Sequence, residues 1–381
     1  MAVWSRLPSV GLVSRAPRSL SVFSSTPSPP AWTRVVSDAE KIVGYPTSFM
    51  SLRCLLSDEL SNVAMHVRKL AGTKHPLLNT ARGFVYDSKH SLQLRGLVVL
   101  LISKAAGPGS PATDTLLQDM VSGIYPSQRS LAEITELIHT AFLVHRGIVN
   151  LKEWTCSDGP LKDMQFGNKM AVLSGDFLLA NACTGLAQLN NTKVVELISS
   201  AIGDLVQGVY HENHESTAEV KEENLSVASW EDQMFLSHGA LLAKSCQAAM
   251  VLAGHDTQAQ GLAYQYGKHL ALGHKLNSDL QPFMRSTAEP ALLHLDSAPV
   301  LFHRLTVGSQ GWLQQVQQTQ STTKRTDYSK LWDLVKTGTG VQQAADLCSY
   351  HGSKAMEAIS CFPASEARSA LENLVGAVTK I

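Results

Sequence analysis

Apolar residues recur along most of this chain three and four positions apart, which is the repeat of an amphipathic α-helix. The stretch "LAEITELIHTAFLVHR" (131–146) shows it clearly, because leucine, isoleucine, alanine and valine return on one face. Strand-like alternation bounded by tight turns is nearly absent. The pattern therefore predicts an all-α fold, a large single-domain helical bundle. The predicted helices cover 48–71, 77–87, 91–106, 129–150, 165–187, 191–211, 229–253, 258–280, 297–318, 328–336, 340–358 and 364–380.

Polar segments separate these helices. "GPGSPATD" (107–114) has the composition of a loop, and "CSDGP" (156–160) that of a turn. "HENHESTAEVKEEN" (211–224) is acidic and has no apolar face, so we expect a mobile loop there.

The N-terminal segment differs from the rest of the chain. It carries Arg6, Arg15, Arg18 and Arg34, many serines, and no acidic residue before Asp38. This composition resembles a mitochondrial transit peptide, and the alternative is a disordered tail that carries no targeting signal. We therefore expect residues 1–35 to be a leader that directs the protein to the mitochondrial matrix, and residues 36–381 to fold.

Charge and composition narrow the choice of partners. Of the 381 residues, 32 are Lys or Arg and 32 are Asp or Glu, so net charge favours neither nucleic acid nor a membrane surface. The hydrophobic content of 44% suggests a large core and a buried subunit face. The six cysteines form no CxxC pair and are expected to be reduced thiols. The apolar run "LVVLLI" (97–102) is too short to span a bilayer, so we expect no transmembrane segment.

The residues alone show no complete catalytic constellation. His211 and His214 are a lone pair without nearby cysteines, so no structural metal is expected. His139 and His145 lie on different faces of one helix and are expected to be structural. Arg146 followed by Gly147 is typical of a helix C-terminus, where a cation suits the helix dipole.

Two stretches carry a resemblance to a known family. "FGNKMAVLSGDFLLANAC" (166–183) and "YGKHLALGHKLNSDLQPF" (266–283) resemble helices beside the two aspartate-rich motifs of trans-polyprenyl diphosphate synthases, which have the isoprenoid synthase fold. The resemblance covers residues 45–381. It implies condensation of an allylic diphosphate with isopentenyl diphosphate. Two DDxxD motifs would hold Mg²⁺ for this reaction, with positions i and i+4 on one helix face.

The chain departs from the family at these motifs. In place of the first DDxxD it has Arg146, Gly147, Ile148, Val149 and Asn150, and in place of the second it has Ser278, Asp279, Leu280, Gln281 and Pro282. A guanidinium 5 Å from Mg²⁺ would repel it by roughly 7 kcal/mol at an effective dielectric constant of about 20. Of the family's residues that grip isopentenyl diphosphate, only Arg95 remains, and its Lys-Thr aligns with Ser237 and His238. Arg95 and Asp279 are therefore remnants of a substrate site.

The resemblance therefore implies a non-catalytic subunit. A catalytic homologue would bind Mg²⁺ and condense farnesyl and isopentenyl diphosphates into the ubiquinone side chain, of decaprenyl type. This chain would hold no cofactor and would join that partner in a hetero-oligomer, a heterotetramer. The alternatives are a regulatory protein that binds isoprenoid diphosphates or lipid, and an autonomous enzyme with a rewired site. We also hypothesise that Arg146 and Asp279 pair across the vacant site.

Overall fold

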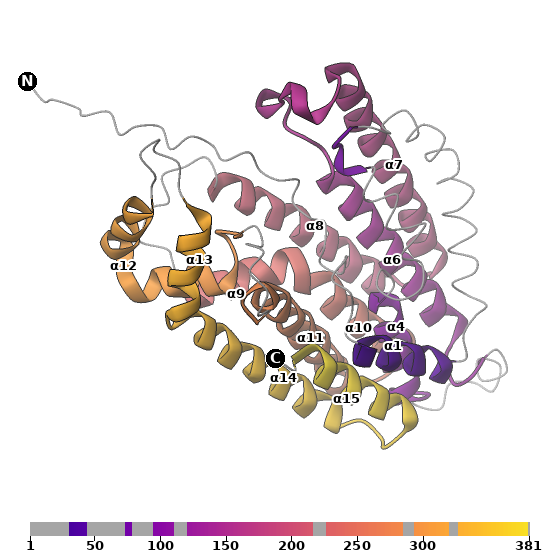
Figure 1. Ribbon diagram of the computed structural model, residues 1–381. Helices are drawn as coiled ribbons and strands as arrows, with labels where there is room; N and C mark the ends of the chain where they lie inside the picture. The colour runs from indigo at the N-terminus through magenta and orange to yellow at the C-terminus, as the bar shows by residue number, and fades with distance from the viewer. Residues whose placement is uncertain are drawn as a thin grey trace, which may run out of the picture.

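The computed structural model describes residues 30–43, 73–77, 94–109, 120–215, 226–284, 293–319 and 327–379. Within these ranges the protein is helical and its one β-bridge, between Val121 and Ile124, is isolated (Figure 1). The helices are α1 (Pro30–Ile42), α4 (Leu94–Ala106), α6 (Pro126–Arg146), α7 (Leu161–Gln188), α8 (Thr192–Glu215), α9 (Val227–Met234), α10 (Ala240–Leu252), α11 (Thr257–Met284), α12 (Ala298–Gln318), α13 (Tyr328–Thr337), α14 (Gly340–Ser360) and α15 (Glu366–Thr379). A π-helical turn, η5 (Phe235–Gly239), joins α9 to α10. Two short 3₁₀ turns, η2 (Leu151–Glu153) and η3 (Cys156–Asp158), precede α7.

Helices α4 and α10 form the centre of the bundle. Both are apolar on nearly all sides, and a helix of that kind is stable only when neighbours cover every face. Val98, Val99 and Ile102 of α4 are fully buried, as are Ala248 and Met250 of α10. Helices α6, α8, α11 and α15 pack around this pair.

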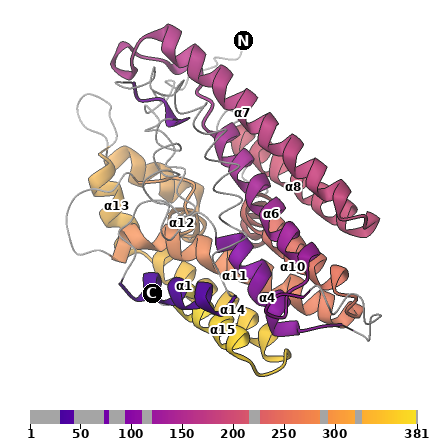
Figure 2. The same cartoon turned by 90° about the vertical axis from the view of Figure 1, so that its right-hand side faces the viewer.

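Extensive helix contacts lie between α11 and α14, between α10 and α11, and between α6 and α7. Leu272, Leu276 and Leu280 of α11 pack against Ala344 and Cys348 of α14. Turning the view by 90° shows α7 running along the outside of the molecule, beside α6 (Figure 2). The ends of α6 and α11, where the family carries its aspartates, therefore belong to helices that pack extensively against their neighbours.

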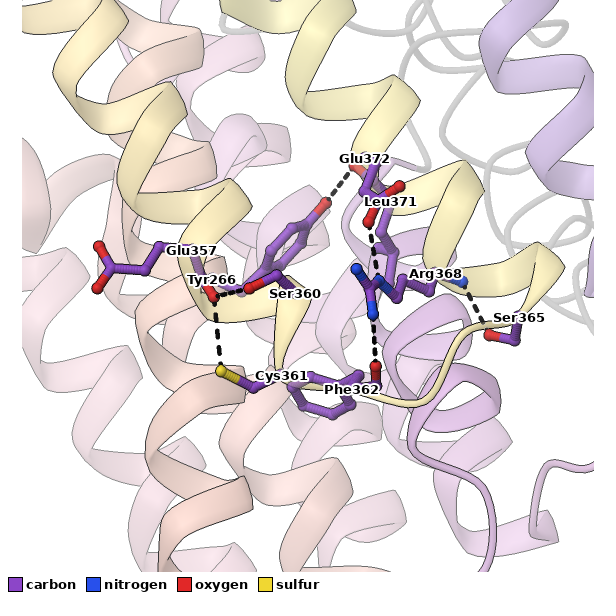
Figure 3. A network of polar contacts seen from close by, with 9 residues as sticks. All are labelled: Tyr266, Glu357, Ser360, Cys361, Phe362, Ser365, Arg368, Leu371 and Glu372. Atoms are coloured by element: carbon purple, nitrogen blue, oxygen red, sulfur yellow. Dashed lines mark hydrogen bonds and ion pairs between the residues drawn. The ribbon is translucent and has the colours of Figure 1, made fainter.

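A polar network fixes the C-terminal helix α15 to α11 and to the end of α14 (Figure 3). The buried Tyr266 hydroxyl donates to the Leu371 carbonyl at 2.9 Å. Arg368 donates to the Glu372 carboxylate at 2.8 Å and to the Phe362 carbonyl at 2.9 Å. Tyr266 is the first residue of the "YGKHLALGHKL" stretch, and its hydrogen bond connects α11 to α15.

The structure confirms the all-α prediction and corrects several boundaries. The helix predicted at 229–253 is divided by the π-helical turn. Residues 211–215 continue α8, so the prediction of a loop there was wrong, and 216–224 lies outside the described residues. The helices predicted at 48–71 and 77–87 also lie outside them, apart from Leu77. Helix α1 was not predicted, and it begins inside the segment interpreted as a leader.

Candidate functional site

Helix α6 ends at Arg146, where the family's first aspartate motif would begin. The guanidinium carbon of Arg146 lies 5.4 Å from the centre of the Phe142 ring one turn earlier, and the residue is half-buried. Gly147 ends the helix with φ −74°, so it is not a left-handed cap. A Cβ there would instead lie 3.0 Å from the Val144 carbonyl oxygen, which makes glycine the best fit. The cation at this helix end interacts favourably with the dipole.

Asn168, in the "FGNK" stretch, holds the segment that replaces the first motif. Its side-chain oxygen accepts from the Val149 amide at 2.8 Å, and its side-chain nitrogen donates to the Val149 carbonyl at 2.9 Å. The same oxygen lies 3.1 Å from Nε2 of the buried His75. The stretch "FGNKMAVLSGDF" therefore contains a residue, Asn168, that positions the backbone at Val149.

Gly175 allows α6 and α7 to approach one another near Arg146. A Cβ at this position would lie 2.2 Å from Nε2 of His145. His145 also lies 3.2 Å from an Asp176 carboxylate oxygen. The His145 ring therefore lies between the two helices, as a structural role would require, and that role stays a prediction.

At the second motif, the remaining acid is engaged on both oxygens. One Asp279 oxygen pairs with the Lys275 ammonium at 2.6 Å, and the other accepts from the Ala298 amide at 3.1 Å. Ala298 is the first residue of α12, whose N-cap residue makes no side-chain cap of its own. Asp279 therefore caps α12 and interacts favourably with its dipole.

Arg95 is buried between α4 and α6. Its guanidinium donates to Nε2 of His139 at 2.9 Å, and the neighbouring Gly96 amide donates to the Glu136 carboxylate at 2.6 Å. Burial raises the pKa of Glu136 to about 7, opposed by the backbone amides and the positive charge of Arg95. Burial also lowers the pKa of His139, so this imidazole is neutral and accepts the hydrogen bond. Arg95, a predicted remnant of the substrate site, thus belongs to a buried polar network that includes His139 and Glu136.

His238 is buried in the π-helical turn η5. Its Nδ1 lies 2.7 Å from the Ser237 hydroxyl, and it lines a cavity with Arg95 and His274. The cavity volume of about 10 Å³ is enough for one water molecule at most. Burial lowers the pKa of His238, and the positive charges of Lys275, Arg146 and Arg95 lower it further. Cations from three helices therefore surround a neutral imidazole.

This arrangement does not fit Mg²⁺, which prefers several carboxylate oxygens. In the ranges that the structure describes, no three His, Cys, Asp or Glu side chains gather as a metal site would require. Sequence reasoning missed Glu136 and Lys275. The signal for Glu136 was an acid on the apolar face of α6, whereas nothing in the sequence indicated which acid Lys275 would pair with.

The Arg146–Asp279 pair remains a proposal, and a double-mutant cycle tests it. Because Arg146 is half-buried and Asp279 already bonds Lys275, we expect a coupling on the order of 1 kcal/mol in the free energy of unfolding. Arg146→Ala and Asp279→Ala would be measured singly and together by denaturant unfolding. The Lys275→Ala and Asp279→Ala cycle is the matched control and should give the larger coupling. Additive effects in the first cycle would exclude the pair.

Comparison with known proteins identifies the family of this chain. Residues 85–289 match the polyprenyl synthetase family. The chain is 65% identical to human "All trans-polyprenyl-diphosphate synthase PDSS2", over 93% of this chain and 89% of that protein. It is 34% identical to a probable mitochondrial hexaprenyl pyrophosphate synthase of Neurospora crassa, over 96% of this chain and 92% of that protein.

Solved structures show the same fold. The apo form of an Arabidopsis medium/long-chain length prenyl pyrophosphate synthase superimposes with a TM-score of 0.57 and is 27% identical. The superposition covers 86% of this chain and 99% of that chain. The resemblance read from the two motif helices is thereby confirmed, and this chain belongs to the polyprenyl synthetase family of prenyltransferases.

Proposed function

We propose that this chain is the non-catalytic subunit of a heteromeric all-trans-polyprenyl diphosphate synthase. A homologous partner would bind Mg²⁺ and condense farnesyl diphosphate with isopentenyl diphosphates, making a decaprenyl-type ubiquinone side chain. One observation carries the proposal. The ends of α6 and α11 present Arg146 and a Lys275–Asp279 pair where the family holds metal with carboxylates.

Electrostatics support the loss of catalysis in this chain. The leaving diphosphate needs metal ions that bridge its oxygens, and fixed cations at both helix ends repel such ions. The single acid at the second motif, Asp279, has both oxygens bonded within the protein. For Asp279 to bind a metal ion, the free energy of binding would have to exceed the cost of breaking its ion pair with Lys275 and its hydrogen bond to the N-terminus of α12.

Helix α7 offers the surface that such a partner needs. Leu173 and Phe177, four positions apart and so on one face of the helix, are 52% and 43% exposed, and the neighbouring Val172 is 41% exposed. Among the described helices, α7 alone has the length and apolar composition of a membrane span, and only 33% of its most apolar window is buried. Contiguous exposed apolar side chains mark an interaction site. We propose that this face binds the catalytic subunit in a hetero-oligomer, a heterotetramer.

Mitochondrial location, in the matrix, completes the proposal. The composition of the N-terminus resembles a mitochondrial leader. The related Neurospora crassa protein is described as mitochondrial. Ubiquinone synthesis is the expected use of the product. A regulator that binds isoprenoid diphosphates or lipid is the alternative, and binding by the isolated chain without any protein partner would favour it.

The purified chain alone should show no Mg²⁺-dependent condensation of farnesyl and isopentenyl diphosphates. The reason is the missing metal ligands at Arg146 and Ser278. Radiolabelled isopentenyl diphosphate incorporation would be measured for this chain alone, for candidate catalytic homologues alone, and for each pair co-expressed. Activity should require a homologue that co-purifies with this chain. Turnover by this chain alone that Asp279→Ala abolishes would contradict the proposal.

A further inference from the structure

Helix α1 is part of the packed core. Val36 and Ala39 of this helix and Val43 directly after it are 3%, 0% and 1% exposed, and they belong to the same apolar cluster as the centre of the bundle. Both views show α1 lying against α4 and α15 (Figures 1 and 2). Arg34 is exposed on the outer side of the helix. It therefore sits on the solvated face of a folded helix, although the sequence placed it among the basic residues of a leader.

Both ends of α1 are tied to the rest of the protein. At its C-terminal end, the Lys104 ammonium of α4 donates to the Ile42 carbonyl, where a cation interacts favourably with the helix dipole. At its N-terminal end, the Trp32 ring lies with its centre 6.5 Å from that of the His274 ring on α11. His274 in turn lines the small cavity with Arg95 and His238. Helix α1 thus reaches from the core to a residue that lines this small cavity.

We infer that α1 remains whole in the mature protein and that cleavage of the leader occurs before Pro30, upstream of the boundary expected at residue 35. This inference rests on the proposed mitochondrial targeting. It moves the processing site of a leader-cleaving protease into the segment before α1, whose basic residues are Arg6, Arg15 and Arg18.

A cut after Val35 would damage the fold in three ways. It would remove Trp32 and its contact with His274. It would leave only Val36 to Ile42 of a 13-residue helix, and helices that short are marginal without tertiary packing along their whole length. It would also create an ammonium at the helix N-terminus, where the dipole is already positive.

Truncation tests the structural part of the inference. Melting temperatures would be compared for the full chain and for chains that begin at residue 30 or at residue 36. The chain from residue 30 should melt within about 1 °C of the full chain, and the chain from residue 36 should melt about 4 °C or more lower. Equal melting temperatures for all three would overturn the inference.

Point variants keep the test informative should the shorter chain fail to fold. In the full chain, Trp32→Ala should lower the melting temperature, while the exposed Arg34→Ala on the same helix should leave it unchanged. Equal effects of the two variants would overturn the inference.

The processing position is read directly from the imported protein. The full chain would be imported into isolated mitochondria, re-purified, and its N-terminal residue found by intact mass. A first residue downstream of Met1 and no later than Pro30 supports the inference, and a first residue after Pro30 overturns it. A chain that still carries Met1 would contradict the proposed leader while agreeing that α1 is retained.

Discussion

Replacing Arg95 by alanine is expected to destabilise the folded protein by about 3–5 kcal/mol, the cost typical of breaking a buried charged pair. Arg95 is 5% exposed, and its guanidinium donates to His139 beside the buried Glu136. Its removal leaves the Glu136 carboxylate without the one positive charge that lowers its pKa. The loss would be measured by denaturant unfolding of wild type and variant.

The loss should grow with pH, which distinguishes a charge effect from a packing defect. Glu136 has a folded pKa raised to about 7 from 4.5, so its stabilising contribution is fully present below pH 4.5 and is lost as pH rises through 7. Near pH 5.5 the carboxyl is protonated with or without Arg95, and the variant loses less. Near pH 8 the carboxylate is ionised and depends on Arg95, so the variant loses more.

Two controls sharpen this result. Adding Glu136→Gln to Arg95→Ala should remove the difference between pH 5.5 and pH 8, because the amide does not titrate. Lys74→Ala removes an exposed cation, 60% accessible and paired with Asp158, and should change the free energy of unfolding by less than about 1 kcal/mol. A pH-independent loss in Arg95→Ala would show that the network acts by packing alone.

Phe177→Asp on α7 is expected to abolish association with the proposed catalytic partner, raising the dissociation constant by about 100-fold or more. The side chain is 43% exposed in this chain, so the substitution should leave the melting temperature of the isolated chain nearly unchanged. In the proposed hetero-oligomer the aspartate would be buried against an apolar face, where an unpaired carboxylate is costly. Loss of binding would also remove prenyltransferase activity from the co-expressed sample.

The measurement is co-purification of tagged partner with each variant, followed by the condensation assay. Leu313→Asp on α12 is the matched control, because Leu313 is 57% exposed and lies far along the chain from α7. It should retain both partner and activity. Retention of the partner by Phe177→Asp, or its loss from Leu313→Asp, would place the interface elsewhere.

The sequence by itself determined the helical class and the departure from the family at the metal motifs. Apolar spacing in α6 and α11 depends only on neighbouring residues, since a 3.6-residue period must put those side chains on one face. The absence of carboxylates at 146–150 and their near absence at 278–282 can likewise be read without coordinates. Which residue types stand at these positions does not depend on the fold.

Only the tertiary structure decided what the remaining polar residues do. Arg95 and Glu136 lie 41 positions apart, and Asp279 accepts from the amide of Ala298, 19 positions later, so spacing could not pair them. The assignment of residues 30–35 to a leader followed composition, but the packing of α1 against α4 and α15 places them in a folded helix. Burial sets the cost of an unpaired charge and the gain from an apolar face. Because burial is a property of the assembled bundle, these roles followed from the packing and not from the order of residues.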